Sequence, residues 1–119
     1  MRRRGHRRAT AAVATIALCL AAPAVAIAAY GAIAINPATG AAGVSRRFAT
    51  LAGAERRARR GCRGRCRILV WVRDECAAAV RTPTDYWAGW GSSRRSAIML
   101  ARRRARDRRS RLVAWTCSL

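Results

Sequence analysis

Cysteine is the residue type in this sequence that points most directly to chemistry. Four of the five cysteines lie in the second half of the chain, at Cys62, Cys66, Cys76 and Cys117. An even set of cysteines in a short chain predicts two disulfide bonds. Four free thiols or a zinc site are the alternatives. The spacing lacks the paired CxxC of zinc sites, and the only histidine is His6 near the N-terminus, so we expect no metal site.

The acidic side chains give little basis for catalysis. The five acids are Glu55, Asp74, Glu75, Asp85 and Asp107. Asp74 and Glu75 are adjacent, so their side chains diverge on an extended segment and form a poor acid–base pair. Glu55 and Asp85 could converge as a glycosidase pair, but we favour salt bridges between these acids and the arginines.

The basic residues also argue against an enzyme. Every one of them is arginine, and His6 is the only histidine. Beyond His6, the chain therefore offers neither an imidazole base nor a Ser–Lys arrangement. We predict a protein with no catalytic residues and no cofactor.

Arginines gather at two equivalent places and are the best candidates for binding. Each set is expected on the polar side of a helix and in the loop after it. The first set comprises Arg56, Arg57, Arg59, Arg60, Arg63, Arg65 and Arg67, and the second comprises Arg102, Arg103, Arg104, Arg106, Arg108, Arg109 and Arg111. The candidate anion-binding residues among them are Arg56, Arg60, Arg63, Arg102, Arg103, Arg106 and Arg109. Such surfaces attract anions, and the alternative is a solvated helix face encoded by GC-rich codons.

Four tryptophans add a second candidate surface. Trp87 and Trp90 lie beside Gly89 and Gly91, where an aromatic surface is one interpretation. Trp71 and Trp115 occupy matching places in an internal repeat, so we expect them in the core.

The N-terminal segment has the three parts of a secretory signal. Residues 1–8 contain five arginines and no acid, residues 9–29 carry no charge, and residues 24–28 offer small-x-small cleavage sites. We predict a signal peptide over residues 1–28 and one extracytoplasmic domain over residues 29–119. An uncleaved membrane anchor is the alternative.

Removal of that segment leaves a strongly basic chain. Of 25 basic residues, 20 remain against five acids, which gives a formal charge of +15. The exclusive use of arginine suggests a GC-rich genome, such as that of an actinobacterium.

The domain contains an internal repeat, with units at about 30–73 and 76–118. Residues 31–35 align with 76–80, residues 43–45 with 89–91, and residues 67–71 with 111–115. The first unit is expected to have strands at 30–35, 41–44 and 68–72 and a helix that begins near Thr50. The second is expected to have strands at 76–80, 86–90 and 112–117 and a helix from Ser93 or Ser96 to Arg106. This predicts an α+β fold in which duplicated ββαβ units form one antiparallel sheet with two helices packed on it, stabilised by disulfides.

These features together resemble domain of unknown function 4189, a family of small exported bacterial proteins. The resemblance is carried by Tyr30–Ala34, Cys62 with Cys66, Cys76–Ala78, Trp87–Gly91 and Cys117. It implies export and the fold, and it implies no reaction.

One departure from the family pattern bears on the disulfides. Family members often carry a further cysteine pair at the places held here by residues 106–110. The loss of both members favours Cys62–Cys66 and Cys76–Cys117 as the bridges, and we expect the second bridge to tie the units together.

The sequence thus predicts an exported, non-enzymatic binding or interaction protein at the cell envelope or outside the cell. An anionic envelope polymer, a lipid or an acidic protein are candidate partners, and nucleic acid binding is expected to be non-specific only. An inhibitor or immunity-type protein of a secreted hydrolase is one alternative. A cationic membrane-active factor is the other.

Overall fold

The computed structural model describes residues 12–16 and 27–119. Most of the predicted signal peptide, residues 1–28, lies outside the described residues, so it stays a prediction. Within the two described ranges, no helix is long and apolar enough to cross a membrane.

Two units with the same order of elements follow one another. The first contains β1 (Tyr30–Ile35), β2 (Ala42–Phe48), α1 (Leu51–Arg60) and β3 (Arg67–Arg73). The second contains β4 (Cys76–Arg81), β5 (Tyr86–Gly91), α2 (Arg94–Ala105) and β6 (Arg111–Cys117). The first strand of each unit is central in an antiparallel sheet, in the orders β2-β1-β3 and β5-β4-β6. The predicted α+β class and the repeated ββαβ pattern are confirmed.

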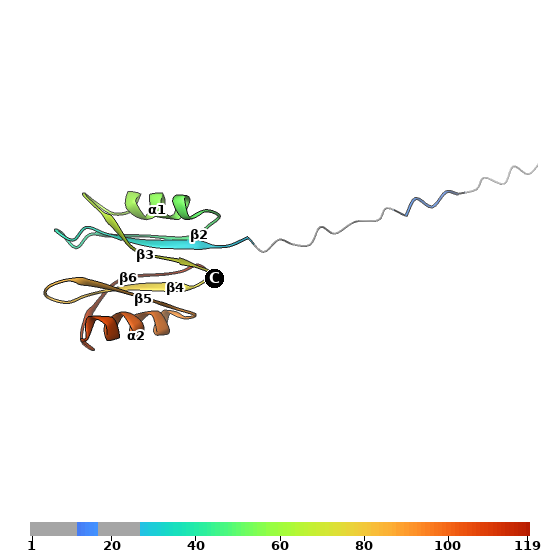
Figure 1. The fold of residues 1–119 in the computed structure, drawn as a ribbon. Coiled ribbons are helices and arrows are strands. Elements are labelled where there is room, and N and C mark those ends of the chain that lie inside the picture. Colours follow the sequence, from blue (N-terminus) through green and yellow to red (C-terminus); the bar gives the residue numbers. More distant parts are fainter. Residues whose placement is uncertain (1–11, 17–26) are drawn as a thin grey trace, which may run out of the picture.

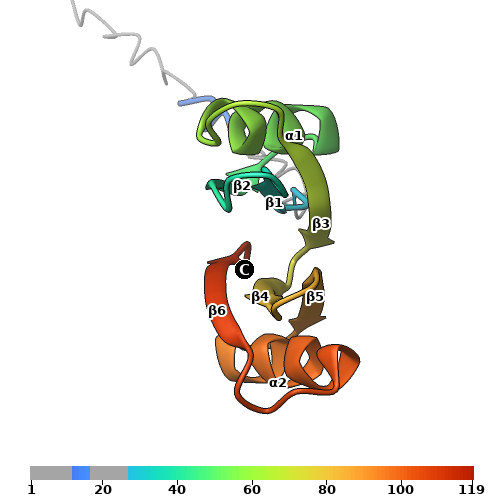
Figure 2. The ribbon, with the colours of Figure 1, turned by 90° about the vertical axis from the view of Figure 1, so that its left-hand side faces the viewer.

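The strands form two facing sheets rather than the one shared sheet that we expected. The layers follow the order α1, first sheet, second sheet, α2, with the helices outermost (Figures 1 and 2). Residues 31–35 of β1 and 76–80 of β4 are all buried, so both faces of each central strand are covered. A helix covers only one face of its sheet. Stacking the two sheets covers the other face of both.

Side-chain size differs between the layers of the core. The space between the sheets is filled by Ile33, Ile35, Val70, Val72, Ala77, Ala79, Tyr86 and Ala88. Alanines dominate under the helices, with Ala54 and Ala58 of α1 on the first sheet and Ala97 of α2 on the second. The small residues allow each helix to lie close to its sheet.

Glycine permits the closest approach in both units. A Cβ atom on Gly43 would overlap the carbonyl oxygen of Ala58, and one on Gly89 would overlap that of Ala97. Each helix backbone therefore rests directly on a strand.

Both helices begin where the sequence predicts. The Thr50 hydroxyl accepts a hydrogen bond from the Gly53 N–H at 3.1 Å. Ser93 is the N-cap of α2, and it forms a capping box with Ser96. The sequence offered Ser93 and Ser96 as alternative starts of α2, and the structure uses both serines in one cap.

The same irregularity in strand pairing occurs in each unit. The register shifts between Ile33 and Ala34 where β1 pairs with β3, and between Ala79 and Val80 where β4 pairs with β6. These positions correspond at an offset of 46 residues, one more than in the sequence alignment of residues 31–35 with 76–80. Because side chains alternate along a strand, an alignment that differs by one residue assigns each side chain to the opposite face of the sheet.

Both predicted cysteine pairings are present. Cys62–Cys66 closes the loop after α1, and Cys76–Cys117 joins β4 to β6. The expectation that the second bridge ties the units together is wrong, because β4 and β6 belong to the same sheet.

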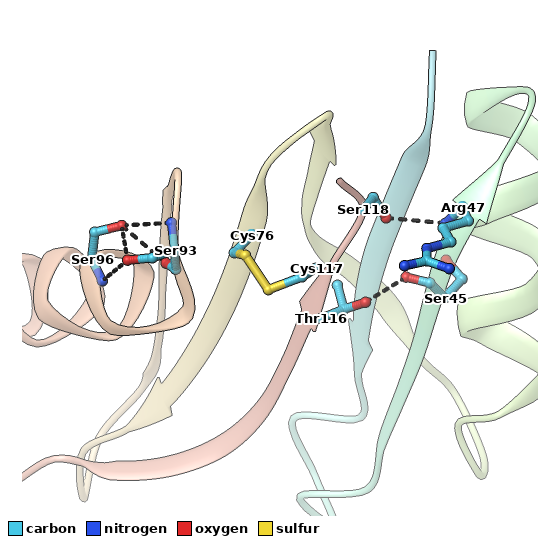
Figure 3. The surroundings of a disulfide bond; sticks show 8 residues. All are labelled: Ser45, Arg47, Cys76, Ser93, Ser96, Thr116, Cys117 and Ser118. Carbon is cyan, nitrogen blue, oxygen red and sulfur yellow. Dashed lines mark hydrogen bonds between the residues drawn. A yellow bond between two sulfur atoms is a disulfide. The ribbon is translucent and has the colours of Figure 1, made fainter. Parts of the chain in front are cut away.

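Hydrogen bonds between β2 and the end of the chain join the units instead. The Thr116 hydroxyl donates to the Ser45 carbonyl oxygen at 2.9 Å, and the Arg47 N–H donates to the Ser118 hydroxyl at 3.1 Å (Figure 3). Thr116 and Ser118 are buried, so these bonds are shielded from water.

Candidate anion-binding sites

The second arginine set borders hollows on the outer side of α2. One hollow of about 620 Å³ and a neighbour of about 490 Å³ share Met99 and Arg102. We call the combined lining the α2 strip; it comprises Arg94, Arg95, Ile98, Met99, Arg102, Arg103, Arg106, Asp107 and Arg108. Met99 is 51% exposed. The strip thus combines guanidinium groups with apolar surface.

The end of α2 explains why arginines gather there. Arg102, Arg103 and Arg104 lie in the last turn, where positive charge interacts favourably with the helix dipole. Arg106 adopts a left-handed conformation, with φ 53°, and ends the helix. The Nε of Arg102 donates to the Ser110 carbonyl oxygen at 3.3 Å, which holds the following loop against the helix.

The single carboxylate of the α2 strip is used by the loop itself. Asp107 Oδ1 accepts a hydrogen bond from the Arg109 N–H at 2.8 Å, and Asp107 takes part in neither ion pair of the described residues. The candidate residues Arg102, Arg103 and Arg106 line the strip, whereas exposed Arg109 lies in the adjoining loop.

The first arginine set lies on the opposite side of the molecule. Arg56 and Arg60 are exposed on α1, and Arg63 is exposed in the loop after it. Both sheets separate α1 from α2 (Figures 1 and 2). The two sets therefore form two basic faces rather than one surface.

Few of these arginines have an acidic partner. Over residues 12–16 and 27–119 the ion pairs are Arg59–Glu55 at 3.8 Å and Arg73–Asp74 at 3.9 Å. Both lie at the surface, although Glu55 is only partly exposed, and such pairs are weak. The salt bridges that we expected from the acids thus involve only Glu55 and Asp74, and both basic faces keep a strong positive potential.

Asp85 stabilises local structure instead of pairing with an arginine. Asp85 accepts a hydrogen bond from the Tyr86 N–H at 2.7 Å in the β4–β5 turn. Glu55 is on α1, so the two residues weighed as a glycosidase pair belong to different units. The described part of the chain also contains no cluster of three or more side chains able to hold a metal ion.

The structure does not bring Trp87 and Trp90 together. Alternation along β5 places Trp90 on the same side as Tyr86 and Ala88, between the sheets, and Trp87 on the same side as Gly89, towards α2. Trp90 is 45% exposed, and the Cζ atom of Arg104 lies 5.1 Å from its ring centre. Trp87 and Trp90 therefore lie at two separate positions and do not form one aromatic surface.

The expectation that Trp71 and Trp115 are core residues is wrong. They are 50% and 40% exposed. Both lie on strands at an edge of their sheet, β3 and β6, where a large side chain can extend past the helix. Trp71 instead lines a hollow of about 420 Å³ together with Trp90 of the other unit. The sequence carries no signal for this shared hollow, because the packing of sheet on sheet creates it.

A second feature missed from the sequence is a small polar cavity where the units meet. Thr39 and Gly40 from the β1–β2 turn line it with Arg81, Tyr86 and Arg111 of the second unit. Its volume is about 260 Å³. These residues share no motif, and only their placement at the ends of adjacent strands brings them together.

Comparison with known proteins identifies the family. The model of domain of unknown function 4189 (DUF4189) matches residues 30–117. The chain belongs to the DUF4189 family. No curated protein matches this DUF4189 chain. It is similar to the NMR structure of Rv1813c from Mycobacterium tuberculosis, with 35% identity and a TM-score of 0.60, over 76% of this chain and 75% of that one.

The DUF4189 match spans both units, including all four paired cysteines. At residues 106–110, where the family resemblance implies a further cysteine pair, hydrogen bonds hold the loop. The Ser110 hydroxyl donates to the Asp107 carbonyl oxygen at 2.8 Å, and Ser110 is buried. The loop beside the α2 strip is thus ordered without a covalent link.

Proposed function

We propose that this chain is an exported, non-enzymatic binding protein that holds an acidic polymer of the cell envelope along the α2 strip. One observation carries the proposal: arginines are concentrated around the exposed side chain of Met99. The one acid of the strip, Asp107, accepts a hydrogen bond from the backbone of its own loop. A solvated basic face needs neither the hollow nor the exposed Met99.

The chemistry of the strip favours a ligand that carries several acidic groups along an extended chain. Guanidinium groups bind carboxylates and phosphates through two parallel hydrogen bonds. Arg94 and Arg95 lie at the start of α2, and Arg106 and Arg108 lie beyond its end. A helix of 12 residues is about 18 Å long, which suits several charges of an extended chain rather than one small ion.

Export is supported by two separate observations. The described domain contains two disulfides, which are typical of oxidising compartments. The N-terminal residues have the order of charge, apolar run and small residues of a secretory signal.

Charge reversal on each basic face tests the proposal. The variant Arg103→Glu/Arg106→Glu/Arg108→Glu should weaken binding of poly-L-glutamate at least about tenfold, because it removes three charge-assisted contacts. The matched control Arg56→Glu/Arg60→Glu/Arg63→Glu changes the net charge equally on the opposite face. Affinities are measured by calorimetry at several salt concentrations, with circular dichroism to confirm folding.

The control variant distinguishes a specific binding site from general electrostatic attraction. Equal losses in both variants would show that only the net charge matters, and the proposed function would be rejected. Leakage of phosphatidylglycerol vesicles at concentrations below those needed for polyglutamate binding would favour a membrane-active protein instead.

A further inference from the structure

The cavity between the units combines two arginines that repel each other. We call it the end pocket; its lining comprises Thr39, Gly40, Arg81, Tyr86, Arg111, Leu112 and Val113. Arg81 on β4 is directly opposite Arg111 on β6. Like charges opposite one another destabilise a sheet. Neither arginine belongs to an ion pair of the described residues, so the pair would be stabilised by an anion.

A buried hydroxyl provides a third group. Tyr86 is 8% exposed, and its hydroxyl is buried with no hydrogen-bond partner among the described residues. Buried polar groups are rarely left without a partner, because the desolvation penalty is large. Since Tyr86 lines the end pocket, a ligand there can accept the missing hydrogen bond.

Gly40 brings these groups to one place. A Cβ atom on Gly40 would lie 3.2 Å from the Tyr86 hydroxyl and 3.5 Å from Nη1 of Arg81. The Cζ atom of Arg81 also lies 5.7 Å from the centre of the Tyr86 ring. The hydroxyl and the guanidinium group thus border the same small space.

The first unit has no such arrangement. At the position equivalent to Arg81 it has Ile35, which pairs with Ala42 on one side and Arg67 on the other. Arg81 pairs in the same way with Tyr86 and Arg111. Ile35 is fully buried in the core between the sheets. The second unit therefore carries a basic and a phenolic residue where the repeat has apolar ones, which a purely structural role does not require.

From these observations we propose that the end pocket binds a phosphate group, either as the free ion or as a monoester. A tetrahedral phosphate offers separate oxygens to Arg81, Arg111 and the Tyr86 hydroxyl, whereas a carboxylate has only two oxygens for three donor groups. The volume of about 260 Å³ leaves room for a small organic group attached to the phosphate. This site is distinct from the α2 strip, so it can fail or succeed independently of the proposed function.

Titration of the full chain with inorganic phosphate tests the proposal. Amide shifts in ¹H–¹⁵N NMR should saturate at Gly40, Tyr86 and Arg111. Arg111→Gln should weaken this binding at least about tenfold, and Tyr86→Phe should weaken it about fivefold, because each removes a hydrogen bond to a charged group. Arg67→Gln is the matched control, since Arg67 occupies the equivalent strand position and the charge change is the same. It should leave the affinity unchanged.

Further ligands establish what the pocket accepts. Glycerol phosphate that saturates the same amides would show that a monoester fits, and its exclusion while phosphate binds would restrict the ligand to the free ion. Shifts that fail to saturate, or equal losses in Arg67→Gln and Arg111→Gln, would overturn the proposal. Acetate that binds as tightly as phosphate would also overturn it, in favour of a carboxylate site.

Discussion

The two units share a fold but are cross-linked at different places. In the first unit a disulfide, Cys62–Cys66, closes the loop between the helix and the last strand. In the second unit hydrogen bonds around Ser110 hold the corresponding loop. The disulfide there, Cys76–Cys117, lies instead where the first and last strands of the unit meet.

The first unit uses a different contact at that meeting point. Tyr30 is opposite Arg73, and the Cζ atom of Arg73 lies 5.9 Å from the Tyr30 ring centre. A cation–π contact of this kind and a disulfide thus occupy equivalent positions. The same ββαβ arrangement thus occurs both with and without a covalent bond at each of the two places.

The largest expected effect concerns the long disulfide. The variant Cys76→Ser/Cys117→Ser releases a constraint over a sequence separation of 41 residues. On the chain-entropy estimate it should lower the free energy of unfolding by about 4 kcal/mol. Urea denaturation followed by tryptophan fluorescence measures the change.

The local disulfide sharpens this comparison. Cys62→Ser/Cys66→Ser releases a separation of only 4 residues, so it should cost about 2 kcal/mol. If both double variants lose the same stability, loop length does not decide the contribution of each bridge. Native strain or structure in the unfolded chain would then account for it.

The second-largest effect tests the contact between helix and strand in each unit. Gly43→Ala and Gly89→Ala place a methyl group on the backbone of α1 and α2, respectively, and each should cost about 3 kcal/mol through overpacking. Gly61→Ala is the control. Its added atom would lie 3.3 Å from the flexible end of Arg57 and at least 3.6 Å from backbone atoms, which is ordinary van der Waals contact. The right-handed conformation of Gly61 also suits alanine.

A large loss in one glycine variant alone would show that the units differ in how tightly their helices pack. Thermal unfolding of the three variants provides the comparison. A destabilised Gly61→Ala variant would instead indicate that glycine is required at the end of α1 for another reason.

The smallest effect concerns the loop that has no disulfide. Ser110→Ala removes the hydrogen bond to the Asp107 carbonyl oxygen and should cost about 1 kcal/mol. Hydrogen exchange should increase at residues 106–110 and stay unchanged at Cys62–Cys66. Faster exchange throughout the second unit would mean that this loop supports the whole unit.

The sequence was sufficient for the order of elements, the helix starts and the family. Hydrophobic patterning and turn residues are local signals, and Thr50 and Ser93 act on neighbouring backbone groups, so these features depend on nearby residues alone. The cysteine pairing followed from the family resemblance.

Tertiary structure decided how the units face each other and which side chains meet. An apolar strand such as β4 does not reveal whether its second face is covered by a helix or by another sheet. Stacking the sheets placed the two arginine sets on opposite faces, and the edge position of β3 left Trp71 exposed. Stacking also brought Gly40 beside Tyr86 and Arg81. Contacts between residues distant in sequence depend on the packing of whole layers, for which local patterns carry no signal.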